Sequence, residues 1–132
     1  MKFLIKNAIL ILIMLHFSPI LHADENPRVI QWAQQTLINT LSVDYNTKPD
    51  DFANISKHYS YNAWQGITQF LGGYMKTIKE NQLDLHPVLQ GDAQISSTGI
   101  FSGISYWVIE QSVAIKELDI TLSFTLTILA RN

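Results

Sequence analysis

The sequence predicts an α+β domain in which N-terminal helices pack on one face of a curved antiparallel sheet of four strands. Apolar residues recur every three or four positions up to about residue 81, as along amphipathic helices. After that point they recur at every second position, as along half-buried strands. The chain has 132 residues and no cysteine, which suits one domain held by packing without disulfide bonds.

Residues 1–23 have the pattern of an export signal. Lys2 and Lys6 give a positively charged start, residues 8–17 are mostly apolar, and the small residue Ala23 suits signal peptidase. The apolar run is shorter than the ~20 residues of a membrane-spanning helix. We therefore predict a cleavable signal.

Cleavage between Ala23 and Asp24 would leave residues 24–132 as a single exported domain. An uncleaved tether in the inner membrane is the alternative that we favour less. The mature domain would function outside the cytoplasm in either case.

Two long helices and a short helical piece are predicted before the sheet. The first helix runs from residue 27 to about residue 43, with Asn26 at its cap and proline in its first turn. A short helical piece is predicted at residues 50–57. The second long helix begins after the candidate cap Ser60, and the pair Gly72-Gly73 predicts a kink or a break within it.

Strands follow once the period changes to two. The predicted strands are residues 83–87, 93–101, 105–115 and 120–128. Pro87 confines the first of them to an edge or an end of the sheet. Residues 90–92 and 102–103 predict turns, and residues 116–118 a tight connection. The last strand has the clearest alternation, with Thr and Ser on its outward face.

Charge and composition exclude several classes of function. Cleavage would leave seven basic and eleven acidic residues, and the basic ones are scattered singly. Nucleic-acid binding needs clustered positive charge, so it is not expected, and membrane contact is expected only indirectly. Neither a metal-ligand spacing nor a nucleophile elbow is found in the sequence. We predict no enzyme activity, no catalytic residue, no metal and no cofactor.

Gln111 is the polar residue that stands out. It interrupts the apolar face of its strand between Ile109 and Val113. A buried amide has to find hydrogen-bond partners, which are most often structural. Contact with a ligand in a pocket is the alternative for Gln111.

A partner surface is predicted from exposed aromatic residues and from the polar face of the sheet. Exposed aromatic side chains commonly anchor protein interfaces. The residues that we select for this surface are Tyr61, Tyr106, Thr121 and Thr125.

Three short motifs resemble the DotI/IcmL family of type IVB secretion and conjugation systems. Residues 59–65 (Tyr-Ser-Tyr-Asn-Ala-Trp-Gln) resemble the Phe-Thr-Pro-Glu-Gly-Trp helix start of that family. Residues 99–109 resemble its Gly-x-Tyr-x-Trp strand start, and residues 128–131 are similar to its closing Val-Val-Arg strand. The resemblance covers the chain from about Pro27 to Asn132.

The resemblance implies a periplasmic domain with a nuclear transport factor 2-like fold, in which helices pack on a curved antiparallel sheet. It also implies a scaffolding role without catalysis or cofactor. The expected partners are other secretion-system envelope proteins, further copies of the chain, or both.

Nuclear transport factor 2-like sheets often enclose a pocket, which leaves a second interpretation. A small-ligand-binding or isomerase-like protein would use that pocket. Asp44, Tyr106 and Gln111 are the candidate polar groups for an isomerase. A pocket lined by Leu122, Phe124 and Leu126 alone would instead favour an apolar ligand.

Overall fold

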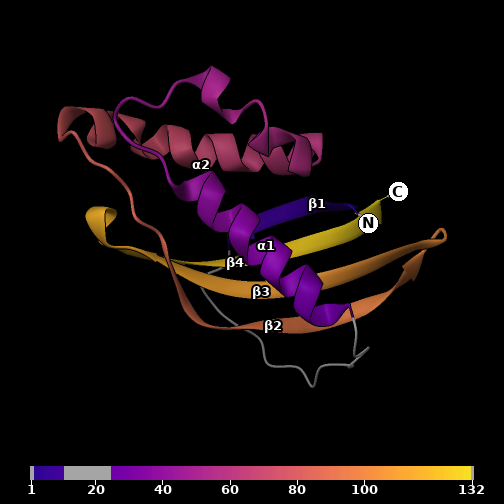
Figure 1. The fold of residues 1–132 in the computed structure, drawn as a ribbon. Helices are drawn as coiled ribbons and strands as arrows, with labels where there is room; N and C mark the ends of the chain where they lie inside the picture. Colours follow the sequence, from indigo (N-terminus) through magenta and orange to yellow (C-terminus); the bar gives the residue numbers. More distant parts are fainter. Residues whose placement is uncertain (1, 11–24, 132) are drawn as a thin grey trace.

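The computed structural model describes residues 2–10 and 25–131, with side chains for residues 3–6 and 25–130. In chain order the elements are β1 (Lys2–Leu10), α1 (Asn26–Leu41), the 3-10 helices η1 (Pro49–Phe52) and η2 (Ile55–His58), α2 (Tyr61–Glu80), β2 (Val88–Phe101), β3 (Ile104–Ile115), the 3-10 helix η3 (Lys116–Leu118) and β4 (Ile120–Arg131). The strands form one antiparallel sheet in the order β1-β4-β3-β2. Figure 1 shows α1 crossing the sheet and α2 running beside β1.

The predicted α+β architecture, with helices packed on a four-stranded antiparallel sheet, is confirmed. Alternate residues of β3 and β4 face the helices and are buried, as the period of two predicts. These inward-facing residues are Trp107, Ile109, Val113, Ile115, Leu122, Phe124, Leu126 and Ile128. The helices add Val29, Ala33, Leu37, Leu41, Ala63, Ile67, Leu71 and Ile78 to the same core.

One of the two predicted helix caps is confirmed. The Ser60 side chain accepts a hydrogen bond from the Ala63 N–H at the start of α2. Asn26 is not the cap of α1, because the helix already includes Asn26 and Glu25 occupies the cap position. Asn26 Oδ1 instead accepts a hydrogen bond of 2.9 Å from Trp107 Nε1. This side chain therefore joins α1 to β3.

The prediction of a strand at residues 83–87 is wrong. This segment pairs with the chain that follows α1, where Leu85 N–H donates to Val43 O at 2.9 Å and Tyr45 N–H donates to Leu83 O at 3.0 Å. Leu85 is buried and Leu83 packs against the core, which explains the alternation without a place in the sheet. The fourth strand of the sheet is β1.

The turn predicted at residues 90–92 is also wrong, because β2 continues through it. The register between β2 and β3 shifts between Gln90 and Gln94, as at a β-bulge. Gly91 has a φ of +71°, which glycine tolerates without a Cβ clash. The glycine therefore bends a strand at this point. The turn predicted at residues 102–103 is confirmed, since β2 ends at Phe101 and β3 begins at Ile104.

A break at Gly72-Gly73 is not found, since α2 is continuous, whereas the kink stays a prediction. Leu71 and Ile78 on either side of the pair are buried in the core. Their packing stabilises the continuous helix, although each interior glycine costs about 1 kcal/mol relative to alanine. A Cβ at either glycine would meet nothing within 4 Å, so no close approach accounts for the pair.

β1 lies within the segment whose composition predicts an export signal. Residues 2–10 pair with β4 along one edge of the sheet, and Phe3 and Ile5 are buried. Ala23 and Asp24, the predicted cleavage site, lie outside the described residues. Cleavage stays a prediction, and the fold shows where β1 lies while it is attached. Neither helix described here has the length and hydropathy of a membrane span.

Candidate interaction surfaces

β1 occupies a slot between the edge of β4 and the start of α2, which we call the strand slot. On one side its residues pair with β4, from Lys2 opposite Arg131 to Leu10 opposite Phe124. On the other side Ser60 N–H donates to Ile5 O at 2.7 Å, and the Ser60 hydroxyl donates to Lys6 O. The backbone of β1 is therefore paired along one edge with β4, and at Ile5 and Lys6 it is also hydrogen-bonded on its other edge.

Two side chains of β1 point into the core from the strand slot. The Phe3 ring lies 5.4 Å from the Trp32 ring and 5.7 Å from the Trp107 ring, measured between centroids. Both distances suit favourable aromatic contacts. Ile5 is fully buried, with 0% of its surface exposed. The slot thus receives an aromatic side chain and, two residues later, an aliphatic one.

Tyr59 forms part of the wall of the strand slot. Its backbone bridges to Ile5, and its hydroxyl shares a hydrogen bond of 2.8 Å with the Thr40 hydroxyl. Burial raises the pKa of the Tyr59 phenol to about 12, since the phenolate would lose its hydration, although the Thr40 hydrogen bond opposes this shift. Tyr59 therefore stays neutral at physiological pH.

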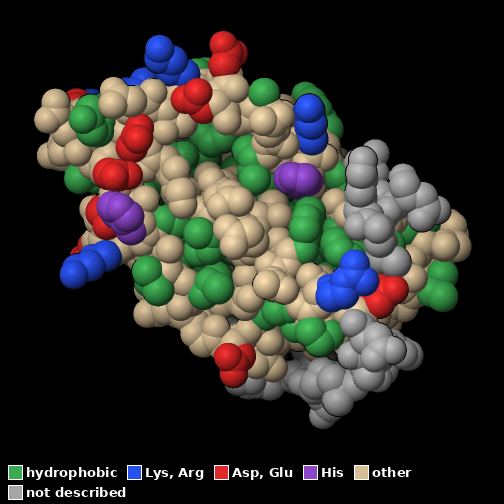
Figure 2. Space-filling view, in the orientation of Figure 1, with side chains coloured by type: hydrophobic (Ala, Val, Ile, Leu, Met, Phe, Trp, Pro, Cys, Tyr) green, Lys and Arg blue, Asp and Glu red, His purple; other side chains and the backbone are tan. Residues whose placement is uncertain are grey.

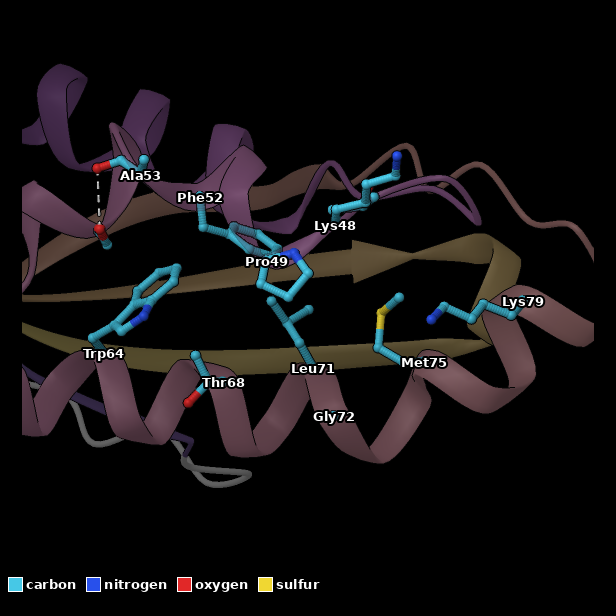
Figure 3. A pocket seen from close by; sticks show the side chains of 12 residues that line it. Lys48, Pro49, Phe52, Ala53, Trp64, Thr68, Leu71, Gly72, Met75 and Lys79 are labelled. Atoms are coloured by element: carbon cyan, nitrogen blue, oxygen red, sulfur yellow. Dashed lines mark hydrogen bonds between the residues drawn. The ribbon is translucent and has the colours of Figure 1, made fainter.

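A second feature is an apolar groove between α2 and the η1–η2 segment, which we call the α2 groove. It has a volume of about 340 Å³, and Phe52, Trp64, Leu71 and Met75 are among its lining residues. Figure 3 shows Lys48 and Lys79 at one end of the groove and Trp64 at the other. The groove therefore suits an apolar segment with a negative charge at one end.

Tyr61 is exposed as predicted, with 77% of its surface accessible. It lies on α2 at helical spacing from Trp64 and Thr68, which line the α2 groove. Residues three and four apart share one side of a helix, so Tyr61 continues the surface of the groove towards the start of α2.

Tyr106, Thr121 and Thr125 share the sheet face opposite the helices, spread along the β3–β4 pair. Their positions in the β3–β4 register alternate with the buried residues, so this common face confirms the period of two. Thr121 is exposed, whereas Tyr106 and Thr125 are half-buried. The four residues predicted as one partner surface are thus divided, with Tyr61 on the helix side.

Gln111 is buried, with 1% of its surface exposed. Its Oε1 accepts a hydrogen bond of 2.9 Å from Gln34 Nε2 on α1. Its Nε2 donates to the backbone oxygens of Gln90, Gly91 and Ser112. The amide thus joins α1, β2 and β3. These bonds are those of a structural residue, and ligand contact by Gln111 stays a prediction.

The groups considered for an isomerase do not converge. Gln111 faces the helices, whereas Tyr106 lies on the opposite face of the sheet. Asp44 lies in the turn after α1, where its carboxylate accepts hydrogen bonds from Asn46 N–H and the Thr47 hydroxyl. Across residues 2–10 and 25–131, no three His, Cys, Asp or Glu residues gather to hold a metal ion.

Positively charged side chains do not form a patch on the face that carries the helices. Figure 2 shows Lys and Arg side chains separated from one another on this face, with hydrophobic side chains between them. This surface lacks the positive stripe that a phosphate backbone requires.

The strand slot is the feature that the sequence interpretation missed. Phe3 and Ile5 are two positions apart and lie between Lys2 and Lys6, a spacing that fits one face of a strand, although the apolar Leu4 separates them. The same residues also fit the charged start of an export signal, so the sequence alone does not predict a strand there.

Comparisons with known proteins give one family and one solved structure. The family described as the type IVB secretion system inner-membrane complex component, DotI/IcmL, has a model that matches residues 10–128. The solved structure of the periplasmic domain of DotI, crystal form I, is similar over 82% of each chain, with a TM-score of 0.58 and 19% identity. This structural likeness supports the predicted fold. Among curated proteins no match was found.

Proposed function

Because the chain belongs to the DotI/IcmL family of type IVB secretion components, we propose that it is a non-enzymatic interaction protein of the periplasm. It associates with a type IVB secretion or conjugation system. Its partners are other envelope proteins of that system, further copies of itself, or both. It needs no cofactor for this role.

The observation that carries the proposal is the α2 groove, which is apolar and open. The residues that line it include large apolar side chains but no carboxylate. A surface of this kind suits protein binding better than acid–base chemistry, which needs a polar group placed at the reacting atom. The exposed Tyr61 ring extends the surface and supplies an aromatic anchor.

The positive charges at the end of the α2 groove indicate which charge a partner segment should carry. Lys48 and Lys79 lie towards the same end, where Lys48 is across the groove from Met75 and Lys79 lies beyond it (Figure 3). We therefore expect an apolar segment that carries an acidic residue at its end to occupy the groove. The face with Tyr106, Thr121 and Thr125 is the other surface proposed for a partner.

Export would place the domain in the periplasm, where it could contact the proposed envelope partners. The positive start, the apolar run and Ala23 support a cleavable signal, with Asp24 as the first residue of the mature protein. Mass measurement of the protein recovered from the cell envelope tests this directly. A mass that includes residues 1–23 would refute cleavage and favour the tethered form.

The experiment that tests the function is capture of the tagged protein from its native envelope after mild cross-linking. Thr68→Glu places a charge in the α2 groove, and Thr77→Glu places the same charge at an exposed position of α2 that does not line the groove. We expect to recover inner-membrane secretion components with the unmodified protein and with Thr77→Glu. Recovery should fall about tenfold with Thr68→Glu, as for a central interface position. Equal recovery with both variants would refute the groove as the contact.

No second function is retained. The isomerase alternative needs Asp44, Tyr106 and Gln111 in one pocket, and these groups lie in three different places. The apolar-ligand alternative needs a pocket lined by Leu122, Phe124 and Leu126, but all three are buried in the core. Neither arrangement favours a small ligand.

A further inference from the structure

We propose that the strand slot is a binding site for an extended segment of a partner protein, and that β1 shows how such a segment is held. The proposal rests on the proposed removal of residues 1–23, because cleavage takes β1 away from the slot. The partner segment would then add a strand to the sheet at the edge of β4.

The backbone of the slot carries the first part of the argument. While β1 is attached, its strand pairs with β4 from residue 2 to residue 10. Without it, the N–H and C=O groups at this edge of β4 lose their partners, and so does Ser60 N–H. An open edge of this length readily pairs with another chain. Strand addition is an established mode of peptide recognition, in which these main-chain bonds supply affinity.

The side-chain pockets of the slot supply selectivity. Loss of Phe3 would expose apolar surface on Trp32 and Trp107, which both contact its ring. Loss of Ile5 would leave the adjacent buried position empty. An apolar hollow of this kind favours a segment with an aromatic residue followed, two positions later, by an aliphatic one.

The next position of the segment favours a basic residue. Lys6 is exposed, and its ammonium group lies 5.9 Å from the centroid of the Phe101 ring. This distance is within the range of a cation–π contact. The Phe101 ring is itself largely exposed at the end of β2. The strand slot therefore favours a segment of four consecutive positions: an aromatic residue, any residue, an aliphatic residue and a basic residue.

The test uses the full chain with a specific protease site inserted among residues 11–24. The protein is folded, cut at that site and mixed with a labelled synthetic peptide of residues 1–10. The control peptide carries serine in place of Phe3 and Ile5, so the folded protein is the same in both measurements. Fluorescence anisotropy reports binding, and size-exclusion chromatography reports release of the cut fragment.

We expect the labelled peptide to displace the cut fragment. The control peptide should bind at least about tenfold more weakly, since it lacks two large apolar side chains. Equal binding of the two peptides would overturn the proposal. So would a fragment that never exchanges, or a cut protein that dimerises and binds no peptide. The peptide-binding assay uses purified protein, whereas the capture experiment uses the native envelope. A negative result for the strand slot can therefore be told apart from a negative result for the proposed function.

Discussion

The Phe3 ring meets the Trp107 indole edge-on, with 5.7 Å between the ring centroids. The same indole donates a hydrogen bond of 2.9 Å to Asn26 Oδ1. Trp107 thereby joins the first strand of the sheet, the third strand and the start of α1. Segments far apart in the sequence meet at one side chain, and the stability of the domain should depend on it.

Phe3→Ala in the full chain should lower the free energy of unfolding by about 3 kcal/mol, because it empties a buried aromatic position. Urea denaturation measures this change. Lys6→Ala is the control on the same strand, and it should cost less than about 1 kcal/mol because Lys6 is exposed. Equal costs would mean that β1 is not packed on the core.

Trp107→Phe should cost about 1–3 kcal/mol beyond the change in packing, because it leaves Asn26 Oδ1 buried without its donor. Trp32→Phe is the control, since Trp32 is only partly buried against the core. Urea denaturation of both variants compares them. A smaller loss for Trp107→Phe than for Trp32→Phe would contradict the role of the hydrogen bond.

Alkaline pH should destabilise the fold through Tyr59, whose pKa is raised from 10.0 to about 12. Folding favours the neutral phenol of Tyr59. The contribution of this group to the free energy of unfolding is therefore fully present below pH 10 and is lost as the pH rises from 10 to 12. We expect the free energy of unfolding to fall by about 2–3 kcal/mol over this range. Denaturation at a series of pH values measures it.

Tyr59→Phe should remove most of this alkaline loss, because phenylalanine does not titrate. Tyr61→Phe is the matched control, since Tyr61 is largely exposed. It should leave the pH dependence as it is in the unmodified protein. An unchanged alkaline loss in Tyr59→Phe would show that another group is responsible.

Gln34 and Gln111 should be energetically coupled by about 0.5–1.5 kcal/mol, the usual net value of a hydrogen bond. A double-mutant cycle with alanine at both positions measures the coupling. Gln35 and Asn39 form a matched pair of exposed amides, joined at 3.0 Å, and should show a coupling near zero. Equal coupling in the two cycles would contradict a structural role of the buried amide.

The sequence was most informative where one local pattern had one meaning. The alternation in β4 predicted its buried face, and Ser60 predicted the start of α2. Patterns with two meanings were less informative. Phe3 and Ile5 fit both a strand and an export signal, so the strand was not predicted. Leu83 and Leu85 alternate because they pack beside residues 43–45, so the strand predicted there is wrong. The α2 groove joins residues 47–56 to α2, and no local pattern indicates that pairing.

Site-specific photo-cross-linking in the native envelope tests the central claim most directly. A photoreactive residue replaces Thr68 in the α2 groove or the exposed Thr77 on the part of α2 that does not line the groove, and mass spectrometry identifies each adduct. We predict an adduct with a type IVB secretion component from position 68 and none from position 77. Adducts from position 77 alone, or from neither position, would contradict the proposal that the α2 groove binds the secretion system.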